Sequence, residues 1–354
     1  MLILDNDDVE KLLDVDSCID SLACAYRALA DGTAVDRART QTYVKLPEPQ
    51  LSYCLKTMEG AIPGTGMMAL RLTSDIISDK DDNGIARRIK LARGPGETYC
   101  GLIVLFSVTR LMPLAIIHDG YIQVFRVACT SALSARLLAR EDAGDLGLLG
   151  SGGQAWAHLQ AMRAVRRLRR VRIFSPDRGH RENFATRAQD ELGLQAEPVA
   201  TAREAVIGAD LVVAATNTNE PIVDGSWLAP GAHVISIVSG DDTLQRRELD
   251  DETLRRASIV VAHSKQIARD QNQGDLSIPV STGILQWDQI YDLSELVAGR
   301  APRRTHEGEI TVFKNNVGLG LQFAAVAGRV YELAQRAGVG RSLPDAWFLE
   351  KLKP

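Results

Sequence analysis

The chain has 354 residues, of which 45% are hydrophobic and 24% charged, and its formal net charge is −4. This composition is typical of a folded protein long enough for two domains, and the charge offers no basic surface for nucleic acid or an anionic membrane. No apolar run reaches the roughly 18 residues of a membrane span, and the N-terminus has no basic, cleavable leader. We therefore expect a cytoplasmic protein.

The five cysteines and six histidines are scattered along the chain. No two cysteines form a CxxC pair, and the histidines show no HExxH spacing. An odd, dispersed set of cysteines is typical of free thiols in a reducing compartment. The sequence predicts neither a disulfide framework nor a metal site.

Helical spacing of apolar residues predicts two short amphipathic helices within residues 8–31, ended by Gly32. The next part of the chain is rich in β-forming residues, broken by Gly and Pro, and predicts an antiparallel sheet. Its expected strands are 42–46, 67–72, 101–106 and 114–117. We expect the polar stretch 75–100 to form a loop over a site, and a helix to follow over 123–139.

From residue 146 to about 262, short apolar runs alternate with helical patterns. The expected strands are 146–150, 171–175, 194–199, 210–215, 233–238 and 258–262. Strands that alternate with helices at this spacing predict a parallel, doubly wound sheet of the Rossmann type. One more strand is expected at 309–314 and a long helix over 319–337.

These patterns predict an α/β fold in which one domain is discontinuous. We expect residues 124–307 to form a Rossmann domain that binds NAD(P). Residues 1–123 and 308–354 are expected to form a discontinuous α+β domain, with a substrate cleft between the two domains, where ligands commonly bind.

A glycine-rich turn follows the first strand of the Rossmann region, with the pattern Gly150-x-Gly152-x-x-Ala155. Gly150 permits a tight turn, Gly152 lets the backbone approach a pyrophosphate, and Ala155 lets the helix pack on the strand. The same turn includes Gly153 and Gln154. The helix N-terminus presents free N–H groups to a phosphate. Such turns also occur without a ligand, and S-adenosylmethionine-dependent methyltransferases have similar ones.

The end of the second strand indicates which dinucleotide is preferred. An acidic residue there would hold the ribose 2′-hydroxyl of NAD, whereas an arginine nearby suits the 2′-phosphate of NADP. Ser175 occupies the strand end, and Asp177 and Arg178 follow it. Ser175 with Arg178 and Arg181 favours NADP(H) slightly, and NAD remains open.

Several segments resemble the ornithine cyclodeaminase/mu-crystallin family, and the resemblance covers nearly the whole chain. The matching segments are Arg126–Asp142, Leu146–Ala155, Ala209–Asn217, Pro230–Val234, Glu248–Asp250 and Phe313–Lys314 with Gly318. The resemblance implies a homodimer that binds NAD(P) and transfers hydride at the α-carbon of a small amino or imino acid. Matches on both sides of residue 150 count against a methyltransferase.

The resemblance also implies catalytic residues. Arg39 lies where the family has an arginine that binds the substrate carboxylate, and Arg126 matches an arginine that reaches both carboxylate and cofactor. Asp242 matches the catalytic aspartate, an acid/base toward the substrate nitrogen or a water molecule; Asp241 beside it leaves this assignment open by one residue.

Arg71 lies in an otherwise apolar strand, so its charge needs a partner or a place at a pocket wall. The family usually has lysine here. Arginine can grip a carboxylate with two hydrogen bonds, but it does not release its proton as a lysine can. A mechanism that uses a neutral amine at this position is therefore in doubt.

A further set of positions is implied to bind the cofactor. Besides the glycine-rich turn, Ser175, Arg178 and Arg126, these positions are Thr98, Thr216, Asn217, Val238, Arg246 and Lys314.

Departures from the family pattern count against ornithine as substrate. Lys56 would repel the side-chain amine of ornithine, although Glu59 is nearby, and Val127 and Phe323 replace the usual threonine and a frequent aspartate. We therefore favour an imine reductase or amino-acid dehydrogenase. A redox-neutral cyclodeaminase, forming proline and ammonia from ornithine, and a non-catalytic binding protein of mu-crystallin type remain as alternatives.

Overall fold

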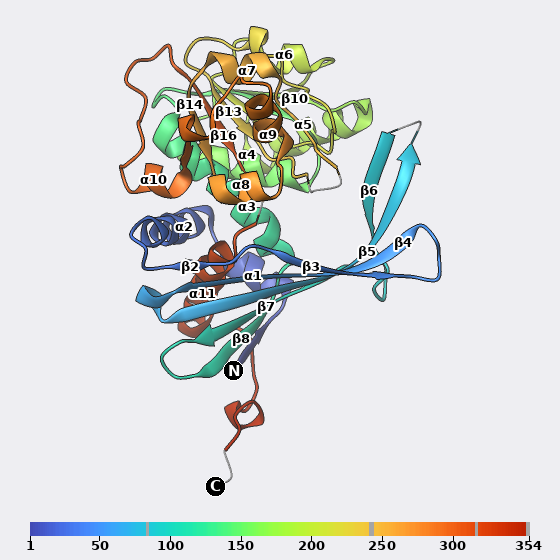
Figure 1. Ribbon diagram of the computed structural model, residues 1–354, viewed down its shortest axis with the longest axis vertical. Coiled ribbons are helices and arrows are strands. Elements are labelled where there is room, and N and C mark those ends of the chain that lie inside the picture. Colours follow the sequence, from blue (N-terminus) through green and yellow to red (C-terminus); the bar gives the residue numbers. More distant parts are fainter. Residues whose placement is uncertain (83–84, 241–243, 316–317, 352–354) are drawn as a thin grey trace. The chain divides into compact units, whose positions relative to one another are not determined.

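The computed structural model describes residues 1–82, 85–240, 244–315 and 318–351 (Figure 1). The chain divides into two compact units, Met1–Gln123 with Gly318–Pro354, and Val124–Val317. The second unit ends later than the boundary that we expected at residue 307. The reason is that β16 (Ile310–Lys314) pairs with β13 and β14 in the sheet of that unit.

Within its described residues, the second unit holds an eight-stranded parallel sheet in the order β11-β10-β9-β12-β13-β16-β14-β15. The remaining strands are β9 (Asp145–Leu149), β10 (Arg170–Phe174), β11 (Ala196–Pro198), β12 (Leu211–Ala214), β13 (His233–Ser236), β14 (Ala257–Ala262) and β15 (Ile290–Asp292). The sheet is doubly wound, because the chain moves from β9 to β10 on one side and then to β12 on the other. The predicted Rossmann-type fold is confirmed; β15 was not predicted.

Helices connect these strands. They are α3 (Gly120–Leu138), α4 (Gly153–Val165), α5 (Arg178–Leu192), α6 (Ala202–Val206), α7 (Asp251–Arg256), α8 (Lys265–Asp270), α9 (Gly274–Ser281) and α10 (Leu293–Val297). The central strands β12, β13 and β16 are buried along their whole length. Strands covered on both faces show no alternation of apolar and polar residues, and β12 is accordingly apolar throughout.

The first unit is built on a mixed sheet in the order β17-β1-β8-β7-β5-β4-β2, with β3 paired to β4 and β6 to β5. Its strands are β1 (Leu2–Leu4), β2 (Val35–Asp36), β3 (Thr40–Lys45), β4 (Leu51–Ile62), β5 (Met67–Asp82), β6 (Ile85–Leu91), β7 (Cys100–Ser107), β8 (Met112–His118) and β17 (Arg341–Ser342). Pairing is antiparallel except between β1 and β8.

The expected loop over 75–100 is wrong for most of its length. β5 continues to Asp82, and β6 pairs with it from Ile85 to Leu91 as a hairpin (Figure 1). The stretch is polar because β5 buries polar side chains, among them Asp75, which forms ion pairs with lysines on β4 and β6. A strand is usually recognised by alternating apolar and polar residues. Here backbone hydrogen bonds and cross-strand ion pairs stabilise the hairpin without that pattern.

The described part of the first unit also contains the α-helices α1 (Asn6–Leu12), α2 (Val15–Ala30) and α11 (Gly320–Ala337). α11 packs on α2, β4 and β5. Its first residue touches the sheet directly, because a Cβ atom on Gly320 would lie 2.0 Å from Glu59 O, and one on Gly60 would lie 2.1 Å from Leu321 N. Among the described residues, no helix is long and apolar enough to cross a membrane.

Candidate functional site

The glycine-rich turn lies at the point where the sheet order reverses. β9 ends at Leu149, paired with Ala214 of β12. Gly150 follows with φ of +117°, and a Cβ atom there would lie 2.3 Å from Ala215 O. Only glycine fits this conformation and this approach. In open α/β sheets, ligands bind outside the carboxyl ends of the strands at such a point.

The start of α4 suits a phosphate group. Gly152 is the N-cap and makes no side-chain cap hydrogen bond, and Cβ atoms on Gly152 or Gly153 would meet nothing within 4 Å. Gln154 Oε1 is buried without a hydrogen-bond partner among the described residues, and Ala155 is fully buried. Unsatisfied N–H groups at a helix N-terminus form a ready anion site. These residues therefore fit the pyrophosphate of a dinucleotide.

The end of β10 carries no free carboxylate among the described residues. Ser175 is buried, and its carbonyl accepts a hydrogen bond of 2.9 Å from Arg181 Nη1. Asp177 caps α5 by accepting from His180 N at 2.7 Å. The Arg178 side chain is 80% exposed and pairs with Glu182. An exposed arginine thus stands beside the strand end where NAD-binding proteins use an acid.

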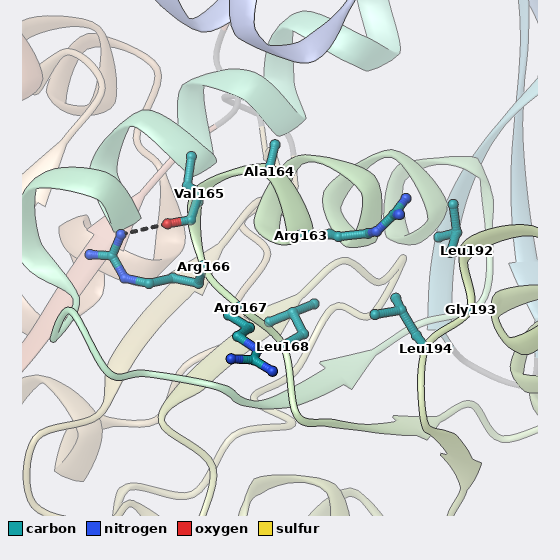
Figure 2. Close-up of a pocket in the computed structure, with 9 residues that line it drawn as sticks. All are labelled: Arg163, Ala164, Val165, Arg166, Arg167, Leu168, Leu192, Gly193 and Leu194. Carbon is teal, nitrogen blue, oxygen red and sulfur yellow. Dashed lines mark hydrogen bonds between the residues drawn. The ribbon is translucent and has the colours of Figure 1, made fainter.

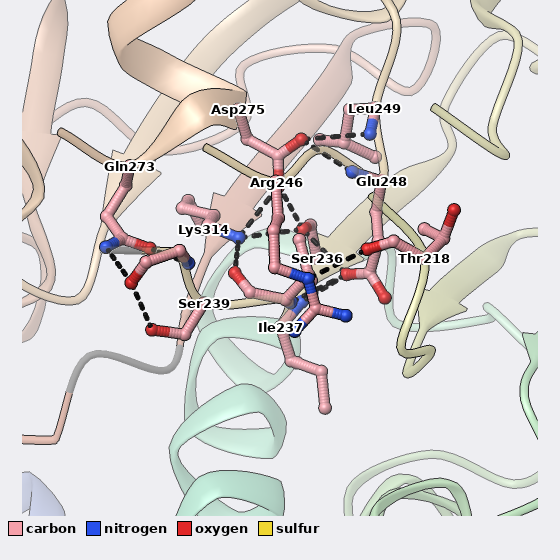
Figure 3. Close-up of polar contacts among 12 residues, drawn as sticks. Thr218, Ser236, Ile237, Ser239, Arg246, Glu248, Leu249, Gln273, Asp275 and Lys314 are labelled. Carbon is pink, nitrogen blue, oxygen red and sulfur yellow. Dashed lines mark hydrogen bonds and ion pairs between the residues drawn. The ribbon is translucent and has the colours of Figure 1, made fainter. Parts of the chain in front are cut away.

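A buried carboxylate, Glu248, holds the loops that follow β12 and β13 (Figure 3). Its Oε1 accepts from Thr216 N at 2.7 Å and Thr216 Oγ1 at 2.8 Å. Its Oε2 accepts from Ile237 N and Val238 N, both at 2.8 Å, and lies 2.9 Å from Ser236 Oγ. Burial raises the pKa of Glu248, and nearby Lys314 opposes this shift.

Lys314 and Asp275 complete this network. The Lys314 side chain is 1% exposed, and its Nζ lies 2.8 Å from Asp275 Oδ2 and 3.0 Å from Ser236 Oγ, and contacts Val238 O. Asp275 also accepts from the backbone N–H groups of Glu248 and Leu249. Lys314 therefore fixes the end of β13 from within the protein, a role that the sequence did not indicate.

Other predicted cofactor residues lie in the same two loops. Thr216 directly follows Ala215 after β12, and Asn217 is exposed. Arg246 Nε donates to Thr218 O at 3.1 Å (Figure 3). It also donates to Asn219 Oδ1 at 3.0 Å. The structure thus brings Thr216, Val238 and Arg246 to the edge of the sheet that carries the Gly150 turn.

Asp242 and the alternative Asp241 lie outside the described residues. The residue before them is anchored, because Gly240 N donates to Gln273 Oε1 and Gln273 Nε2 donates to Gly240 O, both at 3.1 Å. Gln273 is buried. The sequence reading missed this amide, since nothing in its local pattern links it to a segment 33 residues away.

The remaining predicted residues are spread over both units. Arg126 lies inside α3, which begins at Gly120, three residues before the start expected at residue 123, and its side chain is buried. Arg39 is half-buried between β2 and β3. Thr98 is exposed in the turn before β7, where its Oγ1 donates to Pro95 O at 2.9 Å.

Arg71 finds a partner that the sequence reading missed. Its Nε and Nη2 atoms bind the carboxylate of Asp119, at 3.0 Å and 2.7 Å, and Nη2 also donates to Gln123 Oε1 at 3.1 Å. The guanidinium lies 4.7 Å from the centre of the Phe323 ring. Asp119, the residue just before α3, gave no local signal of this pairing.

A separate surface pocket lies at the other end of α4 and is formed by residues 163–168 and 192–194 (Figure 2). In this pocket, Arg166 donates to the carbonyl groups of Val165, Ala135, Ala139 and Arg140. None of the predicted site residues lines this pocket. We assign it no part in the site.

Comparison with known proteins agrees with this geometry. The chain is 28% identical over 345 residues to a Delta(1)-pyrroline-2-carboxylate reductase of Bacillus cereus, an alignment that covers 97% of this chain and 99% of the relative. The solved structure of Thermococcus litoralis Delta(1)-pyrroline-2-carboxylate reductase with NADH and L-proline superposes with a TM-score of 0.82 at 28% identity, over 97% of this chain and 100% of that one.

An archaeal alanine dehydrogenase dimer with bound NAD superposes with a TM-score of 0.80 at 26% identity, over 97% of this chain and 99% of the other. The sequence profile of one family matches residues 1–338. The resemblance noted in the sequence is thereby confirmed: the chain belongs to the ornithine cyclodeaminase/mu-crystallin family.

Proposed function

We propose that this chain is an NAD(P)-dependent oxidoreductase that transfers hydride at the α-carbon of an amino or imino acid, as an imine reductase or amino-acid dehydrogenase. The observation that carries this proposal is the Gly150–Ala155 turn at the reversal point of a parallel sheet. The turn occurs in a chain that matches reductases and dehydrogenases over 97% of its length.

The residues of the turn would hold the coenzyme. Gly150, Gly152 and Gly153 let the backbone approach the pyrophosphate, and the N–H groups at the start of α4 would donate to it. When bound, the nicotinamide supplies or takes the hydride. Thr216, Asn217, Val238 and Arg246 would line the same edge of the sheet, because Glu248 and its partners fix the loops that carry them.

Cationic side chains would hold the substrate carboxylate. Arg39 and Arg126 are assigned this role, and Asp242 would exchange a proton with the substrate nitrogen. Arg71 is held on Asp119 and would orient a ligand. Thr98 is assigned to the coenzyme side.

We further propose a slight preference for NADP(H). Ser175, in place of an acid, and the exposed Arg178 support it, because a guanidinium binds a phosphate group well. The dissociation constants of NADPH and NADH should differ in favour of NADPH, and Arg178→Ala should weaken only NADPH. If the chain binds NADH more tightly than NADPH, and Arg178→Ala does not change the NADH dissociation constant, the preference is for NAD(H) instead.

We also propose that the chain is a homodimer formed through the sheet of the first unit. β7 buries Ile103 and Leu105 on one face but exposes Leu102 and Phe106 on the other, and apolar side chains exposed side by side mark interaction surfaces. Light scattering after size-exclusion chromatography should give twice the chain mass, and Leu102→Lys with Phe106→Glu should give the single-chain mass.

The test of the proposed function is spectroscopic. The purified chain, given NADPH or NADH and an imino acid such as Δ1-pyrroline-2-carboxylate or a 2-oxo acid with ammonia, should consume the reduced nicotinamide stoichiometrically. Gly152→Ala should keep the fold, since a Cβ there meets nothing within 4 Å, yet lose coenzyme binding. Formation of proline from ornithine without net change in nicotinamide absorbance would establish the cyclodeaminase alternative. Tight coenzyme binding without turnover of any imine would establish a binding protein.

A further inference from the structure

A row of buried polar side chains follows Arg71 along β5. Thr73 and Asp75 are 5% and 3% exposed, and Arg71 is 6% exposed. Residues two apart in a strand point to the same face, so all three share one face of the first unit's sheet. Lys56 of β4 pairs in register with Thr73, in the middle of this row.

The charges of this row do not balance among the residues that the structure describes. Lys56 Nζ and Lys90 Nζ both lie 3.1 Å from the same atom, Asp75 Oδ2. Arg71 and Asp119 neutralise each other in a bidentate pair. One carboxylate therefore serves two ammonium groups and leaves one positive charge in excess.

Burial makes this excess charge consequential. The Lys56 side chain is 14% exposed, whereas that of Lys90 is 46% exposed and reaches solvent. Burial lowers the pKa of the Lys56 ammonium group, and repulsion from Lys90 lowers it further. A buried cation without full compensation is costly. A bound anion would supply the missing charge, whereas an ammonium group on a ligand would add to the repulsion.

A second observation points to a ligand at the same place. Thr73 Oγ1 is buried and has no hydrogen-bond partner among the described residues. Buried hydroxyl groups are almost always hydrogen-bonded, so this one is available to a group that enters beside Lys56. A carboxylate oxygen accepts from both a hydroxyl and an ammonium group.

We propose that Lys56 and Thr73 bind a carboxylate at the side-chain end of the substrate, so that the enzyme acts on an imino or amino acid with an acidic side chain. This rests on the proposed function and deepens it. In the reduction, NAD(P)H gives a hydride to the carbon of the C=N bond and a proton goes to nitrogen, forming the amine and NAD(P)⁺. The second carboxylate is unchanged, and Lys56 determines specificity without touching the reacting atoms.

The test compares 2-oxo acids of equal length with ammonia and reduced coenzyme: 2-oxoglutarate with 2-oxovalerate, and oxaloacetate with 2-oxobutyrate. In at least one pair, kcat/KM for the acidic member should be higher by about tenfold or more, the worth of a charged hydrogen bond. Lys56→Met should abolish this preference by lowering kcat/KM for the acidic member about tenfold or more. Lys56→Arg should retain the preference, and Lys45→Met, an exposed lysine on β3, should change neither rate.

Binding provides a measurement that does not depend on turnover. In calorimetric titrations of the protein–coenzyme complex, 2-oxoglutarate or oxaloacetate should bind more tightly than the neutral acid of the same length. This difference in affinity should disappear in Lys56→Met. Asp75→Asn should strengthen binding of the acidic ligands, an effect that a merely structural role of the lysines would not produce. Equal binding of acidic and neutral ligands, or a preference that survives Lys56→Met, overturns the proposal. Lys56-dependent binding without turnover would instead refute the proposed function.

Discussion

Arg71 and Asp119 are 48 residues apart in the chain, and their side chains form a buried bidentate ion pair. The pair joins the middle of β5 to the residue that precedes α3. Removing one member of such a pair leaves an uncompensated buried charge, which costs about 3–5 kcal/mol.

We expect Asp119→Leu to lower the free energy of unfolding by about that amount in urea titration. Arg71→Met with Asp119→Leu should recover much of the loss, because the double variant leaves neither charge of the pair without its partner. Glu191→Gln, which breaks the exposed pair with Arg187, should cost less than about 1 kcal/mol. A loss for Asp119→Leu as small as for Glu191→Gln would contradict the role assigned to the buried pair.

The contact between Gly60 and Gly320 makes a second prediction. A methyl group on either residue would overlap backbone atoms of the other segment, and backbone cannot move aside as a flexible side chain does. Gly60→Ala or Gly320→Ala should lower the free energy of unfolding by about 3 kcal/mol or more. Gly64→Ala, where a methyl group meets nothing within 4 Å, should stay within about 0.5 kcal/mol of the wild type.

Glu248 makes a third prediction, because it accepts hydrogen bonds from Thr216 on one oxygen and from Ile237 and Val238 on the other. Glu248→Gln turns one acceptor into a donor that faces N–H groups, so it should cost about 2–3 kcal/mol of stability. It should also raise the coenzyme dissociation constant by about tenfold or more, since the loops after β12 and β13 lose their anchor. Glu252→Gln, whose side chain on α7 is 40% exposed, is the matched control.

An unchanged coenzyme dissociation constant in Glu248→Gln, measured at a temperature where the variant is folded, would show that these loops do not need the carboxylate. A merely general loss of stability predicts that outcome. The coenzyme titration therefore separates a positioning role from a structural one.

His158 makes a fourth prediction, about pH. It is fully buried between Gln154 O and Ser131 Oγ, and burial lowers its pKa from 6.5 to about 4. Between these values the unfolded chain binds more protons than the folded one, so stability falls as the pH falls from 6.5 to 4. The loss attributable to His158 is about 3 kcal/mol at pH 4.

The unfolding free energy of His158→Gln should therefore fall less in acid than that of the wild type. Between pH 7 and pH 4 the wild type should lose about 3 kcal/mol more than the variant. Asp36 acts oppositely, because burial raises its pKa to about 6, but it is common to both proteins and cancels. Parallel stability–pH curves for the two proteins would rule out His158 as an acid-sensitive group.

Much of the fold could be predicted because its signals are local. The apolar strands at 146–150, 210–215 and 233–238 and the helices at 123–139 and 319–337 were all expected within a few residues of their observed ends. Burial on both faces produces a continuous apolar strand, and burial on one side of a helix produces its spacing. The hairpin of β5 and β6 was missed because its sequence is rich in charged residues, which mimic a loop.

The sequence by itself determined the doubly wound sheet, the glycine-rich turn and the family, since each depends on residue types at short, regular spacing. Only the tertiary structure decided that Arg71 is held by Asp119, that Glu248 and Lys314 tie together the loops after β12 and β13, and that Lys56 and Lys90 share Asp75. These partners come from distant parts of the chain. A side chain's partner depends on which strands become neighbours, and no local pattern of residues records that choice.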